Sequence, residues 1–358
     1  MPIADVATLP TRAAQPRNTL SEPAAEPYSA AVINSGSAVA NRPVALFLLG
    51  NGRSGTSALA RVLSLCGAAL PPGLLGANSE NPRGFFEPRA VIHLNQAILH
   101  DHGSSGYDTA LAPHEQGEFD VAGNSTWVNK ARNYLRGLPP APVVVIKEPK
   151  TTTVARIWFE AARQAGFDVA VVIAVRDPEE IIGSLAKRAG QQNYVDSSPE
   201  LTCAWWLKYS LLAERDTRDV PRVFVEYANL LDDWRREVKR IATALAIDLD
   251  VQDERAIDEF LTPALRHHQT RGAVTEPFGT DWVRTVYETL ATAARDEPCD
   301  TSTMDRVYAE YDAAERGFRR TFDDVRRYRN IDRLLPPFLV KVALETLALV
   351  HRRKETWA

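Results

Sequence analysis

Short apolar runs alternate with segments of helical spacing along the first two thirds of the chain. The runs cover residues 44–49, 142–146, 169–175 and 222–225 and consist mostly of Val, Ile, Leu and Ala. Uninterrupted runs of this length predict strands that are buried on both faces of a sheet. Because helical segments separate them, they predict an α/β fold with a mainly parallel central sheet flanked by helices.

Helical spacing prevails in the C-terminal part of the chain. One apolar helical face consists of Trp234, Val238, Ile241 and Leu245. The stretch 281–327 also predicts helix, with its charges on a solvated face. The sequence therefore predicts a helical C-terminal region.

The first 41 residues have a different character from the rest. They are rich in Ala, Pro, Ser and Thr and carry scattered charges without a sustained period. This composition predicts a disordered leader over residues 1–41. We find no further boundary in the sequence and expect residues 42–358 to form a single domain.

Composition limits the partners and the compartment. A net charge of −4 over 358 residues gives no overall basic field, so nucleic acid is not an expected partner. The three cysteines lie far apart without a C-x-x-C pair, which fits neither a zinc site nor a disulfide framework. We recognise no secretory signal, and no run reaches the roughly 18 apolar residues of a membrane span. We therefore expect a cytoplasmic protein.

A glycine-containing loop follows the first predicted strand and precedes a helix. It reads Gly50-Asn51-Gly52-Arg53-Ser54-Gly55-Thr56-Ser57. Backbone N–H groups and the positive end of the helix dipole make such a loop an anion site, which is the P-loop type of arrangement. In nucleotide triphosphatases the pattern is G-x-x-x-x-G-K-[ST]. Here Thr56 occupies the lysine position, and Arg53 places a cation inside the loop instead.

The loop resembles the 5′-phosphosulfate loop of the sulfotransferases that use 3′-phosphoadenosine 5′-phosphosulfate (PAPS), which reads roughly [KR]-S-G-T-[ST]. The resemblance, which extends to the bacterial branch of the family, implies that Asn51, Gly52, Arg53, Ser54, Gly55, Thr56 and Ser57 bind the cofactor. It also implies that Arg53 reaches the oxygen that bridges phosphate and sulfate. Cytosolic members often have a tryptophan after the loop to stack on adenine. Ala58 stands there, so adenine must be held differently.

A second part of the chain resembles the 3′-phosphate motif of the same family. Arg176, Pro178 and Ser184 match its arginine, proline and serine in type and spacing. The physical basis is sound, because an arginine can donate two hydrogen bonds to one phosphate. Two shorter matches are Tyr227, where relatives have a tyrosine near adenine, and Arg271-Gly272, a segment that returns to the 3′-phosphate. Packing remains an alternative role for Tyr227.

The resemblance and the requirements of sulfuryl transfer together indicate the catalytic candidates. Sulfuryl transfer requires a base for the acceptor hydroxyl and cations around the sulfate oxygens, and it has no obligatory metal. Lys147, at the end of the second strand, matches the family lysine at that place. Glu87, within Asn81-Pro82-Arg83-Gly84-Phe85-Phe86-Glu87, matches the glutamate that serves as base in another branch. His93, Glu148 and His268 are alternative bases.

Together these features predict a PAPS-dependent enzyme that transfers a sulfuryl group to a hydroxyl of a carbohydrate, glycolipid or other alcohol by in-line displacement, leaving 3′,5′-adenosine bisphosphate. A P-loop kinase and a non-catalytic nucleotide-binding protein are the alternatives. Acceptor contacts are expected from residues 107–127 and 191–206. Within them Trp205 and Trp206 belong either to an acceptor cleft or to the core.

The apolar run 338–350, which ends in His351-Arg352-Arg353-Lys354, predicts a helix with two interpretations. It is either a core or homodimer helix, or it rests on anionic lipid and brings the enzyme to a glycolipid acceptor.

Overall fold

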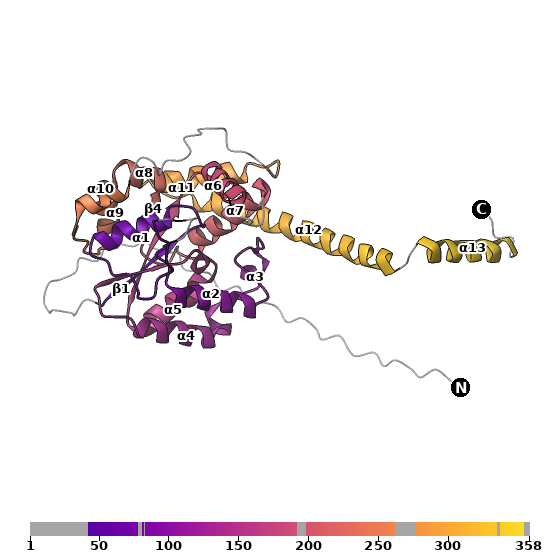
Figure 1. Cartoon of the computed structure of the whole chain (residues 1–358), viewed down its shortest axis with the longest axis horizontal. Helices are drawn as coiled ribbons and strands as arrows, with labels where there is room; N and C mark the ends of the chain where they lie inside the picture. Colours follow the sequence, from indigo (N-terminus) through magenta and orange to yellow (C-terminus); the bar gives the residue numbers. More distant parts are fainter. Residues whose placement is uncertain are drawn as a thin grey trace, which may run out of the picture. The chain divides into compact units, whose positions relative to one another are not determined.

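A computed structural model describes residues 42–77, 81, 83–191, 198–261, 277–334 and 337–353 (Figure 1), with the backbone alone in 186–191, 328–334, 337 and 350–353. The predicted leader, residues 1–41, lies outside this part, and so do His268, Arg271 and Gly272. Residues 42–358 belong to one unit that is separate from residues 1–41.

The four predicted strands are confirmed, with ends that differ by at most one residue. They are β1 (Val44–Leu49), β2 (Val143–Lys147), β3 (Asp168–Val175) and β4 (Arg222–Glu226). They form one sheet in the order β2-β1-β3-β4, and each neighbouring pair is parallel. The carboxyl ends of all four strands therefore meet at the same edge of the sheet. Ligands of open parallel sheets bind at this edge.

Helices connect the strands, as parallel pairing requires. Together with two short 3-10 segments, η1 (Val121–Gly123) and η2 (Pro149–Val154), they are α1 (Thr56–Leu65), α2 (Arg89–Asp101), α3 (Ala112–Glu115), α4 (Ser125–Arg136), α5 (Ala155–Ala165), α6 (Pro178–Gln191), α7 (Pro199–Arg215), α8 (Tyr227–Asp232), α9 (Trp234–Leu245), α10 (Glu254–Phe260), α11 (Trp282–Ala293), α12 (Thr301–Leu334) and α13 (Pro337–Arg353). The predicted fold class, a P-loop-type α/β domain with a helical C-terminal part, is confirmed.

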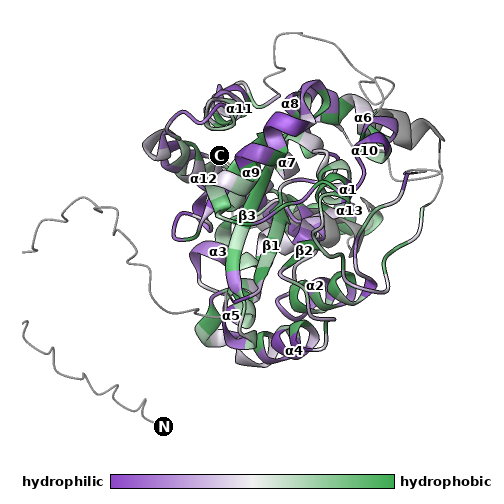
Figure 2. Ribbon diagram, turned by 90° about the vertical axis from the view of Figure 1, so that its left-hand side faces the viewer, coloured by the Kyte–Doolittle hydropathy of each residue, from purple (hydrophilic) through white to green (hydrophobic). Residues whose placement is uncertain are grey.

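Alternate residues of each strand supply two separate cores. Phe47 of β1 belongs to a core that includes residues of α2, α4, α5, α7 and α11. Leu46 and Leu48 belong to a second core with α1, α8, α9 and α10. The strands are apolar in their interiors, whereas the helices combine apolar and polar positions (Figure 2). Successive side chains of a strand point to opposite faces of the sheet. Because both faces are buried here, successive residues must be apolar, and this gives the continuous runs.

One element prediction is wrong. The stretch 281–327 is not a single helix, because α11 ends at Ala293 and α12 begins at Thr301. Asp296 between them has φ +64°, and Pro298 lacks a backbone N–H. The carboxylate of Asp300 then accepts hydrogen bonds from the backbone N–H groups of Ser302 and Thr303, both at 3.1 Å, and so starts α12.

The predicted C-terminal helix is present as α13. Its apolar side chains between Phe338 and Leu349 do not join either core, and most of them are exposed. In the described part of the chain no helix is long and apolar enough to cross a membrane.

Candidate functional site: a cationic phosphate loop at the carboxyl edge of the sheet

The loop after β1 depends on glycine at two positions. Gly50 has φ +128° and Gly55 has φ +88°. A Cβ atom on Gly55 would lie 2.2 Å from the ring of Tyr227, so this side chain packs directly under the loop. Gly52, by contrast, faces open space, with nothing within 4 Å of an added Cβ. The loop is therefore packed against Tyr227 at Gly55, whereas at Gly52 it leaves space for an anion.

A hydrogen bond from the start of the loop to η2 fixes the position of Gly50. The backbone N–H of Gly50 donates to Thr152 Oγ1 at 3.0 Å, and this hydroxyl is fully buried. Thr152 is a site residue that the sequence analysis missed. The run of three threonines after Lys150 was the available signal, but it does not say which backbone they contact.

The N-terminus of α1 supplies the donors for an anion. The first N–H groups of a helix have no intrahelical acceptor, and Gly55 at the N-cap has no side chain to cap them. Arg53, in the same loop, has φ +74° and donates from Nε to Ser184 Oγ at 3.0 Å. The structure thus brings the loop arginine together with the serine of the second motif, 131 residues away.

Arg176, at the end of β3, connects the two halves of the site. Its Nη1 donates to the backbone carbonyl of Arg53 at 2.8 Å, and its Nε donates to Glu180 at 2.7 Å. The guanidinium lies over the Tyr227 ring, 4.7 Å from the centroid. Asp177 starts the following helix, accepting from the N–H of Glu179 at 2.8 Å. Arg176 and Ser184, the arginine and the serine of the second motif, therefore both contact Arg53 of the loop.

Lys147, at the end of β2, is buried and makes three polar contacts. Its Nζ donates to Ser57 Oγ at 3.2 Å, to the carbonyl of Phe85 at 3.0 Å and to Glu87 Oε1 at 2.5 Å. Burial lowers the pKa of Lys147, and the neighbouring carboxylate of Glu87 opposes this shift. The positive charge of Arg53 lowers this pKa as well, which shows that the loop arginine is nearby.

Glu87 reaches the lysine because of its backbone. Phe86, the preceding residue, has φ +56°, a value that a bulky side chain rarely adopts. Asn81 bonds across the turn, donating to the carbonyl of Gly84 at 2.6 Å. The turn places a glutamate and a lysine that lie 60 residues apart in one buried ion pair beside Ser57. The two predicted catalytic residues are thus in direct contact.

The alternative bases differ in their surroundings. Glu148 is buried, bonded to Asn95 at 2.6 Å and to Lys150 at 2.7 Å, and burial raises its pKa. Asn95 also accepts from Trp158 at 2.7 Å, so Glu148 belongs to a packed polar network. His93 is exposed on α2. Among these described candidates, Glu87 alone contacts both Lys147 and, through it, the phosphate loop.

A small hollow adjoins the turn that carries Glu87. It is lined by Arg61, Arg83, Phe86, Glu259 and Phe260. The rings of Phe86 and Phe260 pack edge to face at 6.3 Å, and Arg83 lies over the second ring at 5.6 Å. Arg61 belongs to α1, so the hollow borders the helix that follows the loop.

An aromatic pair lies near the end of β2. Trp205 and Tyr107 have ring centroids 5.2 Å apart, and Tyr107 is 61% exposed. Gly106 approaches the side chain of Lys150, the partner of Glu148. Trp206, in contrast, is 2% exposed and belongs to the core, so the cleft role expected for it as an alternative is wrong. Successive residues of α7 point in different directions, which sends one tryptophan outward and the other inward.

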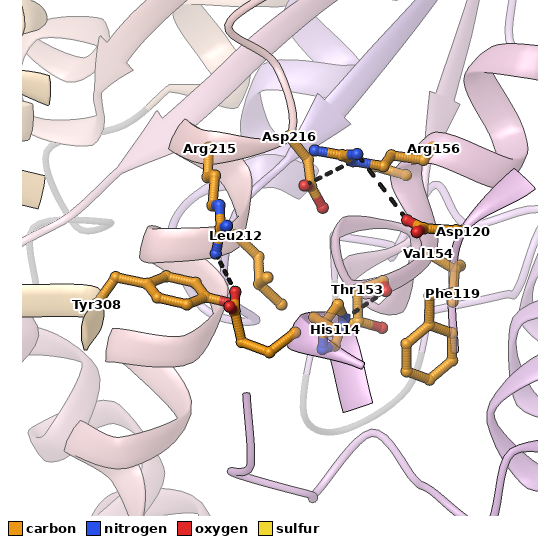
Figure 3. Close-up of a pocket in the computed structure, with 12 residues that line it drawn as sticks. His114, Phe119, Asp120, Thr153, Val154, Arg156, Leu212, Arg215, Asp216 and Tyr308 are labelled. Atoms are coloured by element: carbon orange, nitrogen blue, oxygen red, sulfur yellow. Dashed lines mark hydrogen bonds and ion pairs between the residues drawn. The ribbon is translucent and has the colours of Figure 1, made fainter. Parts of the chain in front are cut away.

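A separate pocket lies between α3, η2, α5, α7 and α12 (Figure 3), and it contains none of the phosphate-loop residues. Its charges pair with one another: Arg215 with Glu115, and Arg156 with Asp216 at 2.9 Å. His114 Nε2 bonds to the carbonyl of Thr153 at 2.9 Å. Because its lining has three carboxylates against two arginines, this pocket is unsuited to an anion.

Comparisons with known proteins find matches among the solved structures. No protein-family model and no curated protein sequence matches the chain. The sulfotransferase domain from the Synechococcus PCC 7002 olefin synthase is 20% identical, with a TM-score of 0.40, over 70% of this chain and 95% of that one. The sulfotransferase domain from the curacin biosynthetic pathway is 15% identical, with a TM-score of 0.35, over 75% and 97%. Retinol dehydratase, in complex with androsterone and the inactive cofactor PAP, is 14% identical, with a TM-score of 0.31, over 62% and 65%. Superpositions of this extent are partial, and we base the function on the site's own residues.

Proposed function

We propose that the protein is a PAPS-dependent sulfotransferase that transfers a sulfuryl group to an acceptor hydroxyl. The observation that carries the proposal is the contact between the two motifs. Arg53 of the loop bonds to Ser184, and Arg176 bonds to the backbone of Arg53. A ligand with phosphates on both its 5′ and 3′ positions needs two adjacent anion sites of this kind. Arg53 belongs to the loop, Arg176 and Lys147 contact residues of the loop, and a group of cations suits a polyanion.

The residues present can divide the chemistry among them. The first turn of α1 and Ser54, Thr56 and Ser57 would hold the 5′-phosphate. Arg53 would neutralise the charge that grows on the bridging oxygen as its bond to sulfur breaks. Lys147 beside Ser57 would contact the sulfate oxygens, and Glu87 would take the proton of the attacking hydroxyl.

The ion pair between Lys147 and Glu87 holds the carboxylate of the proposed base beside Ser57 of the loop. When an acceptor hydroxyl displaces the lysine from Glu87, the lysine becomes able to turn to the sulfate oxygens. The same pair would therefore supply both the base and the cation.

For the adenine ring we propose the hollow beside the loop. Phe86, Phe260 and Arg83 offer aromatic edges and a guanidinium plane close to Tyr227, in a chain with Ala58 in place of the usual tryptophan. For the acceptor we propose a carbohydrate or glycolipid, because the exposed ring of Tyr107 packs against the half-buried Trp205 near Lys150, and rings of this kind pack against sugar faces.

The kinase alternative lacks support at one position. Thr56 stands where a triphosphate loop has its lysine, and the cation of the loop is Arg53. A non-catalytic nucleotide-binding protein would keep both motifs, but it would not need a buried carboxylate paired with Lys147 beside the loop.

Calorimetry with nucleotides tests the proposal. The protein should bind 3′,5′-adenosine bisphosphate more tightly than 5′-AMP, and Arg176→Ala should abolish most of this difference. Loss of a charge-assisted phosphate bond costs roughly 1.5–3 kcal/mol, or about tenfold or more in Kd. The exposed Arg163 on α5 provides the control substitution, Arg163→Ala. Preference for ATP with Mg²⁺ over the bisphosphate would contradict the proposal.

A further inference from the structure

The C-terminal helices expose large apolar side chains. On α12 these are Phe318, Phe322 and Val325, with exposed fractions of 68%, 71% and 57%. Their spacing of four and three residues places them on one stripe. On α13 the exposed apolar residues are Phe338, Leu339, Val340, Val342, Leu344, Leu347 and Leu349. A soluble monomer rarely leaves so many large apolar side chains uncovered on its helices, which points to a partner that covers them.

The pattern of α13 limits the kind of partner. Between Phe338 and Leu349 its polar residues are Lys341, Glu345 and Thr346. The first two are four residues apart and share one narrow stripe, which leaves an apolar arc over most of the circumference. A two-helix seam needs only a narrow stripe at two positions in seven. An arc this wide is broader than the seam of a two-helix contact.

Length excludes a membrane-spanning role for α13. Its 17 residues rise by about 1.5 Å each, or roughly 25 Å in all, which is shorter than the hydrocarbon core of a bilayer. A helix of this kind, with charged residues at its end, lies in the plane of the membrane interface.

Charge decides between a membrane and a second copy of the chain. Residues 316–358 contain 11 Lys and Arg against 5 Asp and Glu, whereas the whole chain has 42 against 46. The remaining residues are therefore acidic overall. A dimer formed through these helices would bring two basic segments together and repel. An anionic lipid surface attracts the same segment, by about 1 kcal/mol for each basic residue near it.

We propose that α12 from Arg316 onward and α13 form a docking surface for anionic phospholipid membranes. The stripe of Phe318, Phe322 and Val325 and the apolar arc of α13 would enter the interface. The exposed Arg326, which borders the stripe, would meet lipid phosphates. The proposal concerns a surface apart from the phosphate loop, so it holds or fails independently of sulfuryl transfer.

Vesicle sedimentation with the full chain tests the proposal. We expect the protein to pellet with phosphatidylcholine vesicles that contain phosphatidylglycerol, and to pellet much less with phosphatidylcholine alone or in high salt. The double variant Leu344→Glu/Leu347→Glu should lose the association, and the charge reversal Arg326→Glu should weaken the partition coefficient by roughly fivefold or more. Because all three side chains are exposed, thermal melting should stay unchanged.

The control is Leu75→Glu, an exposed leucine outside the C-terminal helices, which should bind vesicles as the parent protein does. Three outcomes would overturn the proposal: no sedimentation with anionic vesicles, equal sedimentation with neutral ones, or a dimer in sedimentation equilibrium that Leu344→Glu/Leu347→Glu dissolves. The last result would assign the surface to a second copy of the chain.

Discussion

Single side chains in this protein have roles that their position in the chain does not reveal. Glu87 forms an ion pair with the buried Lys147. Gly55 leaves room for the ring of Tyr227, and His114 forms a hydrogen bond with the carbonyl of Thr153. In each case the neighbour comes from a distant part of the sequence. Substitutions at these positions therefore test the fold and the proposed chemistry separately.

The proposed base is tested by Glu87→Gln, which keeps the size of the side chain and cannot take a proton. If Glu87 activates the acceptor hydroxyl, turnover should fall about a hundredfold or more, and the affinity for 3′,5′-adenosine bisphosphate should hardly change. Steady-state rates and calorimetry give the two readouts. The matched variant is Glu148→Gln, whose carboxylate lies in the network of Asn95 and Lys150.

The result expected at Glu148 is a loss of thermal stability without a selective loss of turnover, because one member of a buried polar network is changed. If the well-folded Glu87→Gln protein turned over at the parent rate while Glu148→Gln was inactive, the base would have to be reassigned to Glu148.

His114 predicts a pH dependence of stability. A carbonyl can only accept, so Nε2 carries the proton towards Thr153, and in the described part of the chain Nδ1 has no hydrogen-bond partner. Burial, and then Lys208, lowers the pKa of His114 from 6.5 to about 3. Between these values the unfolded chain binds a proton that the folded protein does not bind. The free energy of unfolding should therefore decrease as the pH falls through this window, by up to about 1.4 kcal/mol per pH unit.

Urea denaturation at several pH values measures this slope. His114→Gln retains a donor for Thr153 and cannot bind the proton, so its slope should be shallower between pH 6 and 4. His93→Gln, at an exposed histidine, is the control for replacing histidine by glutamine. Parallel curves for His114→Gln and the parent protein would show that the imidazole is accessible to protons in the folded state.

The elements around the site are joined at one edge of the sheet. There the glycine loop contacts η2, α6 and the turn before α2, although each of these follows a different strand or helix. Backbone conformation matters as much as side chains in this region, since Arg53 and Phe86 both have positive φ. Such values are uncommon for residues with a Cβ and are found most often at functional sites.

Two glycines of the loop make opposite predictions. Gly55→Ala introduces a Cβ at φ +88° that would collide with Tyr227, and it should lower the free energy of unfolding by at least ~1 kcal/mol, or the Tm by about 2 °C or more. Gly52→Ala meets open space and should leave the Tm unchanged. If the loop wraps a phosphate, however, Gly52→Ala should weaken binding of 3′,5′-adenosine bisphosphate. Melting curves with and without this ligand separate the two effects, and unchanged affinity in Gly52→Ala would place the anion elsewhere.

The molecule as a whole separates its charges. The acidic bulk of the chain contains a cationic site at the edge of the sheet, and the C-terminal helices are basic again. This local concentration of arginine and lysine is what the proposed reaction uses in place of a metal, because a sulfuryl group has one negative charge fewer than a phosphoryl group.

We therefore predict that sulfuryl transfer survives treatment with EDTA. Transfer from labelled PAPS to a panel of carbohydrate, glycolipid and phenol acceptors, with and without EDTA and then Mg²⁺, is the measurement. A requirement for Mg²⁺, or hydrolysis of ATP in its presence, would favour the kinase alternative.

The sequence by itself determined the features that depend on near neighbours. The four strands follow from continuous apolar runs, the glycine loop from Gly50 and Gly55, and the start of α6 from Asp177 and Pro178. In each of these, a period or a capping group acts within a few residues, so it is readable from the chain alone. The single misjudged element, over 281–327, contained its signal in Pro298 and Asp300, which the helical pattern on both sides obscured.

Only the tertiary structure decided which distant groups meet. The sequence named Arg53, Ser184, Lys147 and Glu87 as separate candidates. The parallel order β2-β1-β3-β4 and the turn at Phe86 bring them together in two bonded pairs. The same holds for Thr152 under Gly50 and for the outward Trp205 beside the buried Trp206. Strand order and positive φ angles are outcomes of packing the whole chain, and local patterning does not encode them.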